Sequence, residues 1–362
     1  MIVAQAFRPA VRARAIGHHS LLLWRGPTPA TCAFASLSYA RGAPPPLAVA
    51  RALRSLRPQA LAPRLWLAAT VCSVCILVPV FAQPSAPATE LKAKFEHRLQ
   101  EISTHVDGVM GYAVLDLTSG DRFVHLDREV FPTASTIKLA IVYEIFKQVD
   151  EGTVRLDQTI TLDRKQAVGG SGVLFAMGTP TLSVRDYATL MVMLSDNTAT
   201  NVLIDLVGMD NVTRRMAGLG LGATKLRRHM IDLAAARRGD ENVSTPSEIV
   251  RLLEVFSKGE GLTASSRADA IALLKKPKSS RLRKALPPGV ETADKPGELE
   301  GVRVDAGIVF AHNRPYILCV MTTYLTNEAE GERAIEEAAR AAYEYFSRLG
   351  DGGLYGRQVG KQ

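Results

Sequence analysis

Strand-like segments lie at both ends of the body of this chain, and a long helical stretch separates them. Residues 108–127, "GVMGYAVLDLTSGDRFVHLD", form two runs about a Thr-Ser-Gly-Asp turn, which predicts a hairpin. Near the other end, three short runs are apolar or alternating: "GVETADKPGEL", "VRVDAGIVFA" and "RPYILCVMTTYL". His312-Asn313 is a predicted hairpin turn between the last two. These strands can share one antiparallel sheet only if the chain leaves it, builds a helical lobe and returns.

Helical patterns precede and follow the strands. The segments "ATELKAKFEHRLQEIS" (88–103) and "NEAEGERAIEEAARAAYEYFSRL" (327–349) have apolar residues at helical spacing. The expected fold class is therefore α+β, an antiparallel sheet flanked by helices plus an all-helical lobe. We expect one domain over residues 89–350, with its helical lobe at about 133–285. An active site is expected in the cleft between sheet and lobe.

The first 82 residues differ in composition from the rest. Residues 1–63 are rich in Ala, Arg and Pro without a sustained hydrophobic period, so we expect disorder or an over-extended gene start. Residues 64–82, "RLWLAATVCSVCILVPVFA", are typical of a signal peptide: an apolar run with a basic flank, ending in small residues. A membrane anchor is the alternative, because the run is close to the length that spans a bilayer. We expect an exported protein, periplasmic or secreted, that meets a membrane only through this segment if it is uncleaved.

The net charge of +8 does not indicate a nucleic-acid partner. Nine of the 44 Lys and Arg residues lie in residues 1–82, which contain no Asp or Glu, so the remainder is close to neutral against its 36 acidic residues. Cys319 is the one cysteine outside this segment, and we expect it to fill the core of a strand. No Cys and His spacing suggests a metal site.

The segment "FPTASTIKLAIVYEIF" (131–146) combines a hydroxyl and an ammonium group with a mostly apolar helix. Ser135 and Lys138 are three positions apart, so they project from one face. A serine becomes a good nucleophile when a base takes its proton, and a lysine can be that base if burial lowers its pKa. The motif alone is a weak signal, and the alternative is a serine in the first turn with a solvated lysine.

Two further motifs have a structural and a functional interpretation. In "LMVMLSDNTATNVLIDLVG", Ser195-Asp196-Asn197 lie between two apolar helices, where they predict either a helix cap or a turn facing the cleft. In "TADKPGEL", Lys295 lies two residues before Gly297 in a short strand. This pattern fits an edge strand protected by lysine and proline, or a cleft edge whose lysine attracts an anionic substrate while the glycine permits close backbone approach.

These three motifs, in this order, resemble the serine β-lactamase and penicillin-binding (DD-peptidase-like) superfamily. Within it they resemble the class A β-lactamases, whose signature is Ser-x-x-Lys, Ser-Asp-Asn and Lys-Thr/Ser-Gly. The resemblance covers nearly all of residues 89–350 and includes "GGSGVL" before the Ser-Asp-Asn turn. The fold that it implies is the sheet and helical lobe expected above.

The resemblance implies a role for each motif. Ser135 would attack a β-lactam carbonyl, Lys138 would take part in removing its proton, and Ser195 would pass a proton to the departing amine. Asn197 would hold the side-chain amide of the ligand, and Lys295 would bind its carboxylate.

The resemblance also implies an oxyanion site. The backbone N–H groups of Ser135 and of Glu298, which follows Gly297, would stabilise the oxyanion, usually a large catalytic term. No metal or other cofactor is implied.

The sequence departs from the family pattern at two places. Pro296 replaces the Thr or Ser of the third motif, which removes a hydroxyl that helps to bind the substrate carboxylate. Because proline has no N–H, we expect residue 296 to face the cleft, as residue 298 does, and the sheet to survive.

The second departure concerns release of the acyl group. In class A enzymes a loop glutamate activates the water that hydrolyses the acyl-enzyme. The matching loop is "RRHMIDLAAARRGDENVSTP", and its register predicts this position at Ala234, which cannot act as a base. Asp232 is our first choice as a substitute, with His229 and Glu241 as others, and the alternative for each is a solvated or helix-capping side chain.

Three functions follow from this constellation. The favoured one is a class A β-lactamase-type serine hydrolase that forms a Ser135 acyl-enzyme. The alternatives are a penicillin-binding or sensor-like module that stays acylated and a D-Ala-D-Ala peptidase. The expected partner is a small-molecule β-lactam or a peptidoglycan stem peptide, and we expect a monomer.

Overall fold

The computed structural model describes residues 85–353 and 355–358. The predicted leader at 1–63 and the predicted signal peptide or anchor at 64–82 lie outside the described residues. Within the described part, no helix has the length and apolar character needed to cross a membrane. The predicted domain boundaries at 89 and 350 stay predictions.

Five antiparallel strands form the main sheet, in the order β2-β1-β9-β8-β7. Strands from the two ends of the chain meet at its centre, where β1 pairs with β9 along its whole length. The strand bounds are β1 (Val109–Asp116), β2 (Arg122–His125), β7 (Thr292–Leu299), β8 (Val302–Val309) and β9 (Tyr316–Thr323). The predicted hairpin turn before β9 is confirmed, and its Asn313 has a left-handed φ of 55°.

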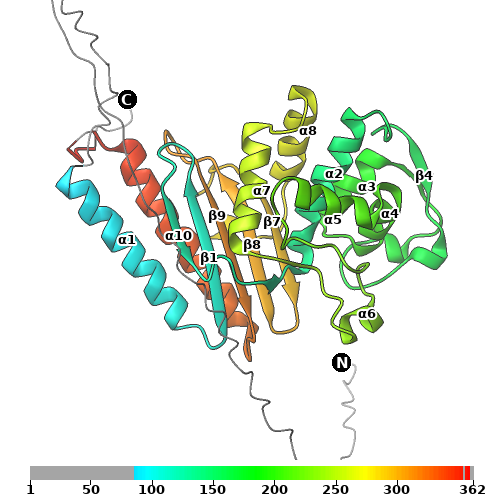
Figure 1. Ribbon diagram of the computed structural model, residues 1–362, viewed down its shortest axis with the longest axis horizontal. Helices are drawn as coiled ribbons and strands as arrows, with labels where there is room; N and C mark the ends of the chain where they lie inside the picture. The colour runs from blue at the N-terminus through cyan, green and yellow to red at the C-terminus, as the bar shows by residue number, and fades with distance from the viewer. Residues whose placement is uncertain (1–84, 354, 359–362) are drawn as a thin grey trace, which may run out of the picture. The chain divides into compact units, whose positions relative to one another are not determined.

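Helices α1 (Ala86–Thr104) and α10 (Glu328–Asp351) pack side by side on one face of this sheet (Figure 1). Aromatic rings join them, because Phe95 stacks on Tyr345 with ring centroids 4.5 Å apart. The short helix α9 (Arg281–Lys284) contacts α10 and contributes Leu282 to the same apolar layer. The first and last described helices therefore stabilise the face opposite the lobe.

The other face of the sheet joins the helical lobe through a continuous apolar core. Helices α7 (Pro246–Lys258) and α8 (Ala264–Lys275) lie between the sheet and the lobe. The lobe contains α2 (Lys138–Asp150), α3 (Val184–Met193), α4 (Asn197–Val207), α5 (Met209–Gly218) and α6 (Leu233–Arg237). Two small antiparallel pairs complete it: β3 (Phe131–Pro132) with β6 (Val243–Ser244), and β4 (Thr159–Thr161) with β5 (Thr181–Ser183).

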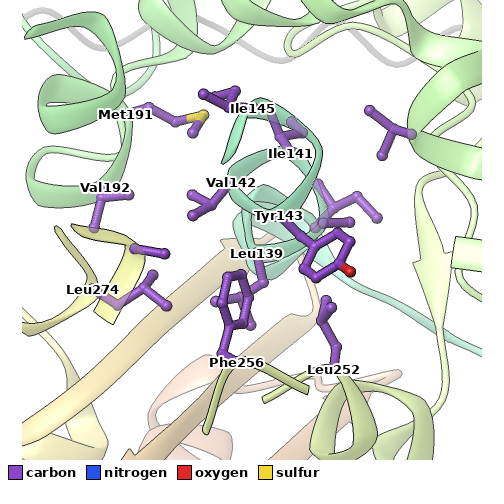
Figure 2. Close-up of a cluster of buried hydrophobic side chains, with 14 of the residues drawn as sticks. Leu139, Ile141, Val142, Tyr143, Ile145, Met191, Val192, Leu252, Phe256 and Leu274 are labelled. Carbon is purple, nitrogen blue, oxygen red and sulfur yellow. The ribbon is translucent and has the colours of Figure 1, made fainter. Parts of the chain in front are cut away.

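Helix α2 is surrounded by apolar side chains on almost every side (Figure 2). Met191 and Val192 of α3, Phe256 of α7 and Leu274 of α8 pack around it. This environment explains why residues 139–146 are so apolar: their side chains face the core in every direction. The predicted α+β fold, with an antiparallel sheet flanked by helices and an all-helical lobe, is confirmed.

Candidate active site

Ser135 lies in a single 3-10 turn, η1 (Ala134–Ile137), that leads directly into α2. Ala134, just before it, has a left-handed φ of 47°, which is uncommon for a residue with a Cβ. The backbone N–H of Thr133 donates to the Asn242 carbonyl at 3.0 Å, which fixes the start of the turn. The strained backbone and its anchor hold Ser135 at the entrance of the apolar helix.

Lys138 is the centre of the site. Its Nζ lies 3.0 Å from Ser135 Oγ and 2.9 Å from Ser195 Oγ, and it also donates to the Ser195 carbonyl at 2.8 Å. Asn197 Oδ1 accepts from the same Nζ at 3.3 Å. One nitrogen thus connects both hydroxyls, so a proton can pass from one serine to the other through it.

The Lys138 side chain is fully buried. Burial holds the pKa of its ammonium group well below the ordinary value, because a charged form is costly away from water. The nearby charge of Lys295 lowers this pKa further, while Asp196 acts in the opposite direction. A lysine with a lowered pKa can be neutral near pH 7, and only the neutral amine can accept the proton of Ser135.

The Ser195-Asp196-Asn197 turn joins α3 to α4. It combines the two predicted interpretations, a helix cap and a turn at the cleft. Asp196 caps α4 by accepting from the Ala199 N–H at 2.9 Å, and it accepts from the Val173 N–H at 2.7 Å. Ser195 has a left-handed φ of 52°, which directs its hydroxyl to Lys138. Asn197 Nδ2 donates to the Gly169 carbonyl at 3.0 Å. The middle residue is therefore structural, while Ser195 lines the cavity and Asn197 contacts Lys138 from α4.

Lys295 reaches the same cluster from the sheet. It is 1% exposed, and its Nζ donates to Ser195 Oγ at 3.1 Å and to the Pro296 carbonyl at 2.8 Å. Burial lowers its pKa to about 8, with Asp305 opposing that shift and Lys278 adding to it. Its position closes a chain of contacts from Ser135 through Lys138 and Ser195 to the strand.

Gly297 lies where β7 passes closest to Ser135. A Cβ at this position would come within 2.7 Å of the Thr133 carbonyl oxygen and 2.9 Å of the Ser135 nitrogen, so only glycine fits. β7 pairs only with β8 within the described sheet, and its register runs unbroken through Pro296. The sheet therefore survives the proline, as expected of an edge strand.

A cavity of about 610 Å³ lies over these groups. Ser135, Ser195, Lys295, Gly297 and Glu298 all line it, so sequence positions up to 163 residues apart meet at one place. Its other lining residues are Ser171, Val192, Met193, Leu194, Pro277, Lys278, Ser279 and Pro296. A larger cavity of about 670 Å³ between α2 and α5 contains none of the predicted site residues.

The predicted substitutes for the loop glutamate are engaged elsewhere. Asp232 caps α6, accepting from the Ala235 N–H at 2.9 Å. His229 Nε2 lies 2.7 Å from Asp205 Oδ1, and Glu241 forms an ion pair with Arg228 at 2.8 Å. None of the three has a hydrogen bond to Ser135, Lys138 or Ser195 within the described residues. Their observed contacts match the capping and ion-pairing alternatives.

Ala234 is also away from the cluster. It is the second residue of α6 and is exposed to solvent. The loop meets the site instead at residues 230 and 231. Asn201 holds the backbone of Met230, and a Cβ on Gly170 would lie 3.1 Å from Ile231 Cδ1 and 2.9 Å from Asn197 Nδ2.

Sequence reasoning missed Asn201, Lys278 and Ser279. Asn201 had a readable signal, because it is an amide four residues after Asn197 and so lies on the same face of the predicted helix. Lys278 and Ser279 belong to the connection between α8 and α9 and had no periodic signal. Only the fold brings that connection beside β7.

A serine and a lysine at the start of a buried helix, a second serine on the lobe and a lysine on the neighbouring strand match the motifs of the class A serine β-lactamase and DD-peptidase-like superfamily. A model of the family described as "Beta-lactamase enzyme family" matches residues 94–346, and the chain belongs to this family.

Individual relatives are distant in sequence but cover most of the chain. An imipenem-hydrolyzing β-lactamase of Enterobacter cloacae is 28% identical over 67% of this chain and 87% of its own length. The crystal structure of a β-lactamase from Sphaerobacter thermophilus DSM 20745 is 29% identical, with a TM-score of 0.65 over 70% of this chain and 96% of that one. A mutant of PBP-A, solved as an acyl-enzyme complex with penicillin-G, is 28% identical, with a TM-score of 0.65 over 72% of this chain and 97% of that one.

Proposed function

We propose that this protein opens the amide bond of β-lactams through an acyl-enzyme on Ser135. The observation that carries the proposal is the position of Lys138 Nζ, fully buried and within 3.0 Å of both serine hydroxyls. This geometry supplies a base for the nucleophile and a route for its proton. The resemblance to β-lactamases and to an acylated penicillin-binding protein supports the same chemistry.

In the proposed acylation, neutral Lys138 accepts the Ser135 proton as Oγ attacks the β-lactam carbonyl carbon. The proton then passes to Ser195, which gives it to the ring nitrogen as the amide bond breaks. The N–H groups of Ser135 and Glu298 would stabilise the oxyanion. The close approach of Gly297 to Ser135 supports this, because it brings the following N–H to the same side of the cavity.

Two cleft side chains would position the substrate. Lys295, at the cavity wall, would bind its carboxylate, and Asn197 would hold the amide of its acyl side chain. Both also contact the catalytic groups, Lys295 through Ser195 and Asn197 through Lys138. Correct positioning of the substrate and of the catalytic groups is therefore coupled in this site.

A specific observation favours a second candidate, a penicillin-binding or sensor-like module that retains its acyl group. The three acidic or basic side chains that could replace the loop glutamate are engaged away from the cluster, as described above. Without a positioned base, water attacks the ester slowly. In that case Ser135 would acylate normally and deacylate over hours.

Export also belongs to the proposal. The apolar run with a basic flank at residues 64–82 supports export across a membrane, where β-lactams and peptidoglycan stem peptides are met.

Intact-protein mass spectrometry of the full chain with benzylpenicillin tests the proposal, with Ser135→Ala and Ser265→Ala as controls. Ser265 is an exposed serine of α8 outside the cavity, so its variant should behave as the wild type. An adduct of the ligand mass that appears and then clears as penicillin is consumed supports the hydrolase. A lasting adduct supports the second candidate, and release of D-Ala from a stem peptide would indicate the peptidase. No adduct on the wild type while the penicillin stays intact would overturn the Ser135 assignment.

A further inference from the structure

Beside β7, the wall of the cavity is formed by the connection between α8 and α9. Pro277, Lys278 and Ser279 line the same cavity as Lys295 and Pro296. The family pattern has a hydroxyl at position 296 that helps to bind the substrate carboxylate, and this chain has proline there. The wall beside the strand therefore contains a serine where the strand has lost one.

The residues on either side of Ser279 are anchored to the sheet. Lys278 Nζ lies 3.8 Å from Asp294 Oδ1 and donates to the Leu274 carbonyl at 2.6 Å. Ser280 Oγ donates to Asp305 Oδ2 at 2.9 Å. Both anchoring carboxylates are at most 1% exposed, so the two contacts are protected from water. The backbone of Ser279 is thus held in place from both sides.

The Ser279 side chain is directed differently from those of its neighbours. While Lys278 and Ser280 direct their polar ends into the buried carboxylates, Ser279 is exposed and lines the cavity. Within the described residues its hydroxyl has no hydrogen-bond partner in the protein. It is therefore available to donate to a bound ligand.

Charged groups of both signs lie around this wall. Burial lowers the pKa of Lys295 to about 8, so it is mostly protonated at pH 7. The ammonium group of Lys278 is engaged by Asp294 and two backbone carbonyls, and the Glu298 carboxylate also lines the cavity. Two nearby arginines are directed elsewhere: Arg281 and Arg303 pair with Glu332 of α10, at 2.8 and 3.2 Å. A substrate carboxylate would therefore meet the Lys295 ammonium group and hydroxyls here, without a guanidinium group from these two residues.

We propose that the Ser279 hydroxyl donates a hydrogen bond to the substrate carboxylate held at Lys295, supplying from the neighbouring α8–α9 connection the hydroxyl that Pro296 removes from the strand. This assignment rests on the proposed function, because it concerns the substrate of that site. It makes Ser279 a binding residue and gives the site specificity for ligands with a free carboxylate.

The test compares acylation of the full-length wild type, Ser279→Ala and Ser265→Ala by benzylpenicillin and by its methyl ester. The second-order rate of adduct formation is followed by intact-protein mass spectrometry. Ser279→Ala loses a hydrogen bond to a charged acceptor. Its acylation by the acid should therefore be about tenfold slower, because the benzylpenicillin concentration needed for the half-maximal rate rises. Its acylation by the neutral ester should be less than about threefold slower. Ser265→Ala should match the wild type with both substrates.

A second variant tests whether a hydroxyl on the strand can replace that of Ser279. Pro296→Ser restores the hydroxyl on the strand, so it should recover most of the loss when combined with Ser279→Ala and add little on its own. Equal rates for Ser279→Ala and Ser265→Ala would overturn the assignment and leave the proposed function standing. The assignment is also overturned, and the proposed function stands, if Ser279→Ala slows acylation by the acid and by the ester to the same extent. No adduct on the wild type with either substrate would overturn both.

Discussion

Asn201 holds Met230 by both of its backbone polar groups. Its Oδ1 accepts from the Met230 N–H at 2.8 Å, and its Nδ2 donates to the Met230 carbonyl at 3.2 Å. Because Asn201 follows Asn197 by one helical turn, the two side chains lie on the same face of α4. Residue 230 is therefore tied next to the amide that contacts Lys138, whereas Ala234 lies beyond it in α6.

This relationship predicts where a carboxylate would restore hydrolysis. Met230→Glu should shorten the lifetime of the penicillin adduct at least tenfold, because a general base in reach of water contributes about 10²-fold or more. Ala234→Glu should leave the lifetime unchanged. The decay of the adduct, followed by intact-protein mass spectrometry, gives its lifetime in each variant, and circular dichroism checks the fold. If Ala234→Glu shortens the lifetime and Met230→Glu does not, the glutamate position of the family corresponds to Ala234.

Removal of the Lys138 amine should affect chemistry far more than folding. We expect Lys138→Met to slow acylation by roughly 10²- to 10⁴-fold, the usual contribution of a general base. Its melting temperature should not fall, because burial already opposes the charged form of the lysine. Lys94→Ala, on exposed α1, is the matched control. A variant that acylates at the wild-type rate would exclude Lys138 as the base.

The pKa of Lys295 predicts the alkaline limb of the pH profile. As the pH rises through about 8, Lys295 loses its proton, and with it the charge that attracts the substrate carboxylate. The acylation rate with benzylpenicillin at low concentration should therefore fall above this pH, and the methyl ester should not show the same fall. Lys295→Arg should shift the limb to higher pH, since a guanidinium keeps its proton. If the pH profile of acylation is the same in Lys295→Arg as in the wild type, the alkaline limb does not come from Lys295.

A methyl group at position 297 should disturb both stability and acylation. Gly297→Ala places its Cβ 2.7 Å from the Thr133 carbonyl, a contact that the rigid turn η1 must relieve by shifting. We expect a loss of about 1–3 kcal/mol in the free energy of unfolding and slower acylation. Gly178→Ala is the control, since a Cβ there meets nothing within 4 Å. Urea denaturation of both variants measures the difference, and equal stabilities would refute the close approach.

Stability should also depend on pH through Asp305. Burial and the neighbouring charge of Asp294 raise the pKa of Asp305 to about 7, above its value in the unfolded chain. The folded state thus binds this proton more tightly, so its stability contribution is full at about pH 4 and is lost as the pH rises through about 7. Asp305→Asn should flatten the decline in melting temperature between pH 5 and 8. If the melting temperature of Asp305→Asn declines with pH as steeply as that of the wild type, groups other than Asp305 cause the decline.

The local patterns were sufficient for the fold and for the Ser135–Lys138 pair. Residues three apart on one helix must meet, and strands at both ends of a chain can share a sheet only around an inserted lobe. The contact between Ser195 and Lys295 spans 100 residues, so no spacing rule predicts it, and only the family resemblance suggested that they meet.

The loop register was the part that sequence could not determine. Residues 227–246 have no hydrophobic period, so nothing in them fixes which side chain faces the site. The determinant is Asn201, a residue of another element that holds the loop by the backbone of Met230, so this contact does not depend on the side chain at position 230. A backbone clamp of this kind has no signal in the loop itself.

The pairing of β1 with β9 sets the order in which this protein can be completed during synthesis. Strand β1 is made early, but its partner β9, the central strand of the sheet, is made about two hundred residues later, and α1 must wait for α10. Local helices of the lobe can form while the chain is still growing, whereas the sheet cannot close until residues 316–351 have left the ribosome. A truncation that removes only α10 should therefore leave the apolar layer on one face of the sheet without its cover, even though every residue of the proposed active site is already present.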